Sequence, residues 1–200
     1  GGMWLGLFRV LDRKASVADL AVRDASVDGE YLLGMLAGRN MGHVAGCRAD
    51  GIVSAVYDAG GLIGSNAGDI SDCYVVGEVN AVASSSVGGL TGSNYGSVSR
   101  CYAAARVTSI EPVQGYVTGG LVGNVSNSYR LGPPGEIHDS YFLIDTDRGG
   151  PDNGFGVSLT DAQMRQQTSF PGFDFETTWT ICEGRDYPRL RWEAIDCNRP

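Results

Sequence analysis

Histidines are the first residues to consider for catalysis, because a hydrolytic or proton-transfer site most often places one beside a nucleophile. The 200-residue sequence has two, His43 and His138, and neither lies in a local signature of a serine, cysteine or metal-dependent enzyme. We interpret both as surface histidines. The sequence therefore predicts no catalytic residues and a protein that is not an enzyme.

Three of the five cysteines follow one another at long, similar intervals: Cys47, Cys73 and Cys101 are 26 and 28 residues apart. Structural zinc sites pair their cysteines across two to four residues, so the spacing does not favour zinc. At equivalent positions of stacked strands the three would lie about 4.8 Å apart, which is within the Cα range of a disulfide. Cys73 could then pair with one neighbour, but we favour three buried free thiols that pack as small apolar side chains.

The other two cysteines, Cys182 and Cys197, are near the end of the chain. They are a candidate disulfide that would fix the C-terminal segment in an oxidising compartment. With five cysteines, at least one thiol has no partner within the chain.

A run of carboxylates beside glycines raises the question of a calcium site. Asp145, Asp147 and Asp152 provide oxygen ligands, but they lack the spacing and the closing glutamate of an EF-hand loop. Asp and Gly also form ordinary turns, which is the interpretation that we favour. We expect no bound metal and no cofactor.

Three tyrosines, Tyr74, Tyr102 and Tyr141, recur at equivalent places in the sequence. If their rings face outward, they form an aromatic strip that suits sugar rings; if they face inward, they form a stack in the core. The sequence leaves both open, and the three are the candidate ligand-binding residues.

The elements that must position these residues come from an internal repeat. Gly60-Gly61-Leu62-Ile63-Gly64-Ser65-Asn66 aligns with Gly88-Gly89-Leu90-Thr91-Gly92-Ser93-Asn94, and shorter or degenerate copies occur near Leu7, Leu36 and Leu121. The five leucines are 29, 26, 28 and 31 residues apart. A second column contains Val17, Val44, Ile70, Val98 and Ile137.

Such units cannot cover their own apolar face, but stacked on one another they form one continuous core. We therefore predict an all-β fold, a β-solenoid of about five coils over residues 1–157, with right-handed crossovers as parallel strands prefer. Glycine and asparagine at fixed offsets are expected to supply positive φ angles at the corners. A β-sandwich would not repeat one signature in register, and a propeller blade is longer.

Residues 158–200 have a different character. Residues 158–167 predict a short helix, with Thr160 and Gln163 as a capping box, and most of the large aromatic residues outside the repeats follow. Because the last coil of a solenoid exposes an apolar end, we predict that this segment is a C-terminal cap over that end.

Composition limits the partners. The formal net charge is −8 and Lys14 is the only lysine, which argues against nucleic acid and anionic lipid as partners. No apolar run reaches 18 residues, so direct membrane insertion is not expected. Arg9 occupies a position that is glycine in other coils. An uncovered first coil would need further sequence, and we expect the chain to be part of a larger polypeptide or assembly.

The unit Gly-Gly-Leu-x-Gly-x-Asn-x-Gly-x-Ile/Val-x-x-Cys-Tyr resembles the GLUG motif, a repeat of bacterial surface proteins and adhesins that also occurs beside IgA-specific metallopeptidases. The tail resembles the segment that closes such arrays. No His-Glu-x-x-His helix is present. The resemblance implies a non-catalytic module of an exported or cell-surface protein, serving adhesion, binding of a glycan or of a host or cell-surface protein, or a stalk.

Two alternatives remain open at this point. β-helix enzymes that act on polysaccharides are also stacked coils, although they need clustered carboxylates and a positioned base. The second alternative is a purely structural unit whose coil ends or edges assemble with neighbouring chains.

Overall fold

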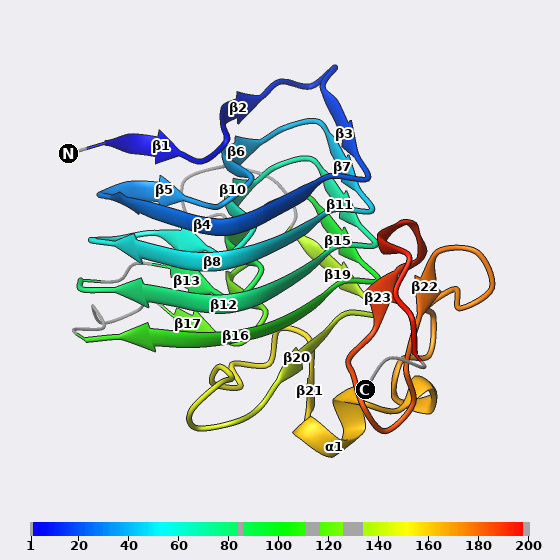
Figure 1. Ribbon diagram of the computed structural model, residues 1–200. Helices are drawn as coiled ribbons and strands as arrows, with labels where there is room; N and C mark the ends of the chain where they lie inside the picture. The colour runs from blue at the N-terminus through cyan, green and yellow to red at the C-terminus, as the bar shows by residue number, and fades with distance from the viewer. Residues whose placement is uncertain (1, 84–85, 111–116, 126–133, 198–200) are drawn as a thin grey trace.

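The computed structural model describes residues 2–83, 86–110, 117–125 and 134–197. Within them the chain winds through four parallel sheets, so that each turn of the chain adds one strand to every sheet (Figure 1). The prediction of an all-β solenoid is confirmed. We name the sheets A to D in the order in which the chain enters them.

The first two sheets contain short strands. Sheet A consists of β1 (Met3–Leu5), β5 (Tyr31–Leu33), β9 (Ala59–Gly60), β13 (Ser86–Gly88) and β17 (Val117–Gly119). Sheet B consists of β2 (Phe8–Leu11), β6 (Ala37–Asn40), β10 (Ile63–Asn66), β14 (Thr91–Asn94) and β18 (Val122–Asn124).

The third sheet is also short, whereas the fourth has the longest strands. Sheet C consists of β3 (Ser16–Ala18), β7 (His43–Ala45), β11 (Asp69–Ser71), β15 (Ser97–Ser99) and β19 (Glu136–His138). Sheet D consists of β4 (Ala21–Gly29), β8 (Arg48–Ala55), β12 (Tyr74–Ala81), β16 (Tyr102–Ser109), β20 (Tyr141–Leu143) and β21 (Val157–Leu159). Four full coils are followed by a fifth turn, β17 to β20, whose sheet D strand β20 has 3 residues where β16 has 8.

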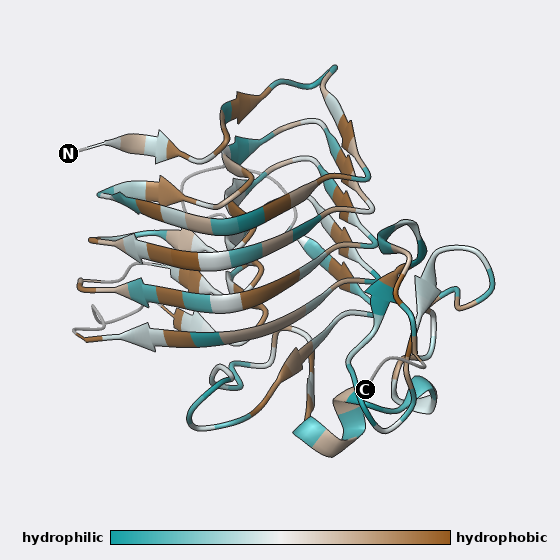
Figure 2. Cartoon of the chain, in the orientation of Figure 1, coloured by the Kyte–Doolittle hydropathy of each residue, from teal (hydrophilic) through white to brown (hydrophobic). Residues whose placement is uncertain are grey.

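Strand register follows the sequence repeat. Ile70 pairs with Val44 on one side and Val98 on the other, as the second predicted column requires. On sheet D, successive side chains of β12 and β16 alternate between the core, which contains Val75, Val79, Ala103 and Val107, and the outer face, which contains Tyr74 and Tyr102. Figure 2 shows that the strands of this sheet carry both hydrophobic and hydrophilic residues. The core is therefore a set of side-chain columns that run along the stack.

The leucine column is buried everywhere except at its first member. Leu36, Leu62, Leu90 and Leu121 are fully buried, but Leu7 is 59% exposed. The column thus holds in coils two to five, and the expectation fails for Leu7 because no described segment stacks on the outer side of the first coil.

The prediction that the glycines of the Gly-Gly-Leu-x-Gly blocks supply positive φ angles at the corners is wrong. Repeat glycines such as Gly38 and Gly64 do not have a positive φ. A Cβ on Gly38 would lie 2.5 Å from the carbonyl carbon of Trp4, in the backbone of the preceding coil. These positions are glycine because the backbones of successive coils come too close for any side chain. The positive φ angles of the corner between sheets C and D belong to Asp19, Gly46, Asp72, Arg100 and Asp139.

The repeat asparagines also have another role than the one expected. Asn40, Asn66 and Asn94 are fully buried, and none has a positive φ. The side-chain amide of Asn40 donates to the Asn66 side-chain oxygen, and that of Asn66 to the Asn94 oxygen, each at 2.8 Å. A buried amide must be hydrogen-bonded to be tolerated, and this ladder satisfies all three residues.

The end of the stack is covered by a segment other than the predicted cap. We call residues 144–156, which connect β20 to β21, the closing loop. The amide of Val107 donates to the Gly149 oxygen at 3.1 Å, and that of Gly120 to the Pro151 oxygen at 2.7 Å. Phe155 packs against the main core. The closing loop therefore lies over the last coil, where the sequence predicts the tail.

We call residues 160–197 the cover, because they lie beside the stack against the outer face of sheet D (Figure 1). The cover contains α1 (Asp161–Met164), the 3-10 turns Gln167–Ser169 and Arg191–Glu193, and the antiparallel pair β22 (Trp179–Thr180) and β23 (Arg189–Leu190). The predicted capping box between Thr160 and Gln163 is present, but the helix is shorter than the predicted 158–167. The predicted boundary at 157/158 falls inside β21, which pairs with β20.

Candidate functional site

The tyrosine ladder, Tyr74, Tyr102 and Tyr141, lies on the outer face of sheet D. Strand register places the three side by side on β12, β16 and β20. The rings of Tyr74 and Tyr102 stack with centroids 5.0 Å apart. Their orientation is outward, but all three are buried, because the cover packs over them.

The cover contacts the ladder through aromatic rings. Trp179 lies with its centroid 5.9 Å from Tyr102, and Phe170 lies edge-on to Tyr141 at 5.0 Å. Together with Phe173 they form a second apolar cluster, separate from the core of the solenoid. Because burial of such rings dominates the energetics of an interface, this cluster holds the cover on the stack.

Each hydroxyl of the ladder is hydrogen-bonded to the cover. Tyr74 donates to Glu193 at 2.8 Å, Tyr102 to the Pro188 oxygen at 2.6 Å and Tyr141 to the Pro171 oxygen at 2.6 Å. Burial raises the pKa of Tyr74 and Tyr141 to about 12. The hypothesis of an exposed aromatic strip is therefore wrong: the ladder faces outward but serves as the seat of the cover.

Two further contacts extend the attachment toward the first coils. Arg48, on the second coil, forms an ion pair with Glu193 at 2.7 Å. The indole nitrogen of Trp192 donates to the Gly46 oxygen at 2.9 Å. The cover thus runs along the flank of the stack rather than over its end.

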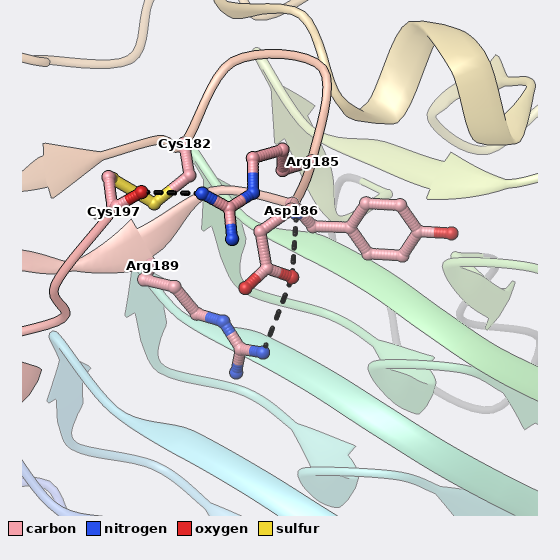
Figure 3. The surroundings of a disulfide bond; sticks show 6 residues. Cys182, Arg185, Asp186, Arg189 and Cys197 are labelled. Atoms are coloured by element: carbon pink, nitrogen blue, oxygen red, sulfur yellow. Dashed lines mark hydrogen bonds and ion pairs between the residues drawn. A yellow bond between two sulfur atoms is a disulfide. The ribbon is translucent and has the colours of Figure 1, made fainter. Parts of the chain in front are cut away.

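A disulfide joins Cys182 to Cys197 within the cover (Figure 3). Arg185, from the loop between them, donates to the Cys197 oxygen at 2.6 Å, and Asp186 forms an ion pair with Arg189 at 3.7 Å (Figure 3). The loop carrying Arg185 and Asp186 is thereby tied to both the end of the chain and β23.

The other three cysteines are buried free thiols, as the sequence analysis favoured. They do more than fill space. The amide of Cys47 donates to the Cys73 sulfur at 3.3 Å, and the amide of Cys73 to the Cys101 sulfur at 3.4 Å. The amide of Cys101 donates to the Ser140 hydroxyl at 3.1 Å, so a serine can continue the ladder.

The candidate calcium ligands lie in turns of the closing loop. Asp145 accepts from the amides of Asp147 and Arg148 at 2.9 and 3.0 Å, and Asp152 accepts from the Gly154 amide at 2.9 Å. These are the contacts of ordinary Asp-initiated turns. In the described part of the chain, no group of three or more His, Cys, Asp or Glu side chains is arranged to hold a metal ion.

Both histidines lie on the outer face of sheet C. His43 pairs with Asp69 at 2.9 Å and His138 with Glu136 at 3.3 Å, with all four side chains more than half exposed. Ser97 stands next to Asp69 in the same column, on the side away from His43. An acid between the histidine and the serine does not form a catalytic triad, in which the histidine stands between the other two.

An open groove lies beside the cover and was not predicted from the sequence. It has a volume of about 280 Å³ and is bounded by sheet D, the closing loop and Tyr187 of the cover. Its floor is apolar, with Val76, Ala104 and Leu143. Glu78, Arg106, Asp147 and Arg148 surround this floor. A hint existed in the alternation along β12 and β16, which places these residues on one face.

The fold defines the class: a parallel β-solenoid built from a sequence repeat. Residues 55–80 and 83–108 match the family model described as the GLUG motif. These ranges contain β9 to β11 with β12 up to its next-to-last residue, and β13 to β15 with β16 up to its next-to-last residue, which are the third and fourth coils. The chain therefore carries two adjacent GLUG repeats. Comparisons with curated proteins and with solved structures gave no match.

A search of the described residues for a helix long and apolar enough to cross a membrane found none.

Proposed function

We propose that this chain is a non-catalytic repeat module of an exported or cell-surface bacterial protein, and that it acts in adhesion by binding a glycan or a host or cell-surface protein. The observation that carries the proposal is the stack of coils itself, two of which match the GLUG motif. A stack of this kind offers long, regular outer faces, on which repeat proteins build their binding surfaces.

The disulfide of the cover supports an exported location. Disulfides persist in oxidising compartments and are rare where thiols are kept reduced. Cys182 and Cys197 are bonded, whereas the three thiols of the stack are buried and free. This combination suits a protein whose exposed segment is stabilised outside the cytoplasm.

The experiment is a binding test on surfaces. Beads coated with the purified chain are incubated with intact host-type cells that are untreated, treated with periodate to destroy glycans, or treated with protease. The same incubations are checked for released sugars. We expect retention on untreated cells, loss after one of the treatments, and no released product. No retention on any surface, or release of product, would contradict the proposal.

Location is tested separately in the producing bacterium. Antibody raised against the chain should label intact cells or the culture medium. Labelling only after lysis would contradict the proposed location.

A further inference from the structure

The groove lies at the edge of the cover, where one outward column of sheet D ends its contact with the cover and the next begins. The cover packs over the column of the tyrosine ladder, and its Tyr187 borders the groove. In the next column, Val76 and Ala104 lie in register on β12 and β16, and both pack against the edge of the cover. Ala104 is buried and Val76 is half-buried, and the surface that they still expose forms part of the apolar floor of the groove. Ala104 has the smallest side chain of this floor.

Four charged side chains stand around this floor. Glu78 and Arg106 are opposite each other on β12 and β16, and Asp147 and Arg148 come from the closing loop. Arg148 is held in place by Asp145 at 3.4 Å and Asp161 at 3.3 Å. The rim thus carries two acids and two guanidinium groups, which balance in charge.

Such a rim offers both kinds of hydrogen-bonding group. Carboxylates accept two hydrogen bonds side by side, and guanidinium groups donate two in a fork. A neutral ligand with neighbouring hydroxyls uses both, and an apolar face of the same ligand rests on the floor. A small concave site with an apolar base and a few placed polar groups is the usual form of a ligand site.

We propose that this groove binds one neutral pyranose unit of a glycan, with the apolar C–H face of the ring on Val76 and Ala104 and its hydroxyls on the Glu78 and Arg106 side chains. The inference rests on the proposed function and assigns it a site. A volume of about 280 Å³ suits a single sugar unit rather than a long segment.

A peptide is the less favoured occupant. Peptides that bind to sheets commonly add a strand to a free edge. β12 is paired on both sides, by β8 and β16. The far edge of β16 pairs with β20 at Tyr102 and Ala103 and hydrogen-bonds the closing loop at Val107, so only a short stretch of edge remains at the groove. The other polar groups at the groove are side chains, which suits a ring with hydroxyls better than an extended backbone.

The test uses methyl pyranosides as probes. A set of neutral methyl pyranosides, the corresponding methyl uronates and a neutral tripeptide is titrated into isotope-labelled chain, and amide shifts are followed by NMR. We expect at least one neutral pyranoside to shift the amides of Val76, Ala104 and Arg106. We expect the uronates and the peptide to give weaker effects.

Two variants locate the site. Arg106→Gln removes the guanidinium group, and because this side chain is exposed the variant should fold. It should weaken binding about tenfold, as expected for the loss of hydrogen bonds to a charged group. Ala104→Leu fills the floor and should abolish binding. The matched control is Arg23→Gln, on the exposed face of the first coil, which should bind as the original chain does. Melting curves verify that each variant is folded.

Absence of shifts at the groove with every pyranoside, or binding that survives both Arg106→Gln and folded Ala104→Leu, would overturn the inference. A stronger response to uronates or to the peptide would overturn the choice of a neutral sugar. If cells still retain the chain while the groove is silent, the surface-module proposal stands and the groove assignment fails.

Discussion

The two ends of the stack contain the same repeat positions, but these positions are exposed in the first coil and covered in the last. At the first coil, Leu7 is 59% exposed and Arg9 occupies the glycine column, with its guanidinium 5.6 Å from the ring centre of Trp4. At the last coil, Leu121 is fully buried and the closing loop lies over the coil. In both places the sequence position in the repeat is the same.

This difference teaches what each repeat position is for. Arg9 is tolerated because no described backbone lies against it, whereas Gly38, one coil later, meets the backbone of Trp4. The first coil also contains a β-bulge between Val22 and Ala25, with Asp24 at a positive φ. Bulges and charged residues are common on unpaired edges, where they hinder association with other strands.

The largest contrast is expected within the leucine column. Leu90→Ala should lower the free energy of unfolding by about 2–5 kcal/mol, because it leaves a cavity in a packed core. Leu7→Ala should change it by less than about 0.5 kcal/mol, as for other surface positions. Urea denaturation of the two variants measures both values. Equal losses would show that the first coil is as well covered as the fourth.

The second prediction concerns the disulfide, whose loss should destabilise the cover and leave the first coil unchanged. Cys182→Ser with Cys197→Ser opens a loop with a sequence separation of 15 residues, which is worth about 3 kcal/mol in the chain-entropy model. The loss should fall on the cover, so limited proteolysis should cut within 160–197 first. As a control, thiol titration of the unreduced, denatured chain should find three free thiols. Five free thiols would mean that the bond does not form.

The glycine column offers a paired test of close backbone approach. A Cβ on Gly64 would lie 2.7 Å from the Leu32 carbonyl oxygen. Gly64→Ala should therefore cost about 1–3 kcal/mol by overpacking, while Arg9→Gly at the equivalent place should be close to neutral. Thermal melting compares the two. A harmless Gly64→Ala would contradict the explanation of the glycine column.

The last expected effect is a loss of stability in alkali that starts at the cover. The pKa of Tyr74 and Tyr141 is raised to about 12 by burial, above the usual 10.0. A folded-state pKa above the unfolded value gives stability that is fully present below pH 10 and is lost as the pH rises through about 12. Tyrosinate absorbance and circular dichroism during an alkaline titration should show the cover detaching in this window. Ionisation of all tyrosines near pH 10 would contradict the burial of the ladder.

Much of the stack could be predicted from the sequence, because a repeated coil puts equivalent residues in register. The column through Val44, Ile70 and Val98 follows from spacing alone, whereas spacing places the three cysteines in one column without deciding between free thiols and a disulfide. The Asn40–Asn66–Asn94 ladder was misjudged, because Asn-x-Gly is also a turn signature and spacing does not distinguish a corner residue from a buried amide chain.

The site was harder to predict. The position of the cover could not be read from its aromatic residues, since Trp179 or Phe170 would bury equally well on the end of the stack or on its flank. The cover lies on the flank because the tyrosine ladder points outward there. Which side chains of a strand point outward depends on the residue at which the preceding corner ends. The groove follows from that choice, because its floor lies at the edge of the cover.

Hydrogen exchange followed by mass spectrometry tests the central claim most directly, namely that the chain is a stack of coils with one bare end and one covered flank. We predict the slowest exchange in peptides that contain β12 and β16, and much faster exchange in residues 3–11, because amides exchange through local opening and the first coil has neighbours on one side only. Uniform protection along all coils, or fast exchange in β12 and β16, would contradict this account.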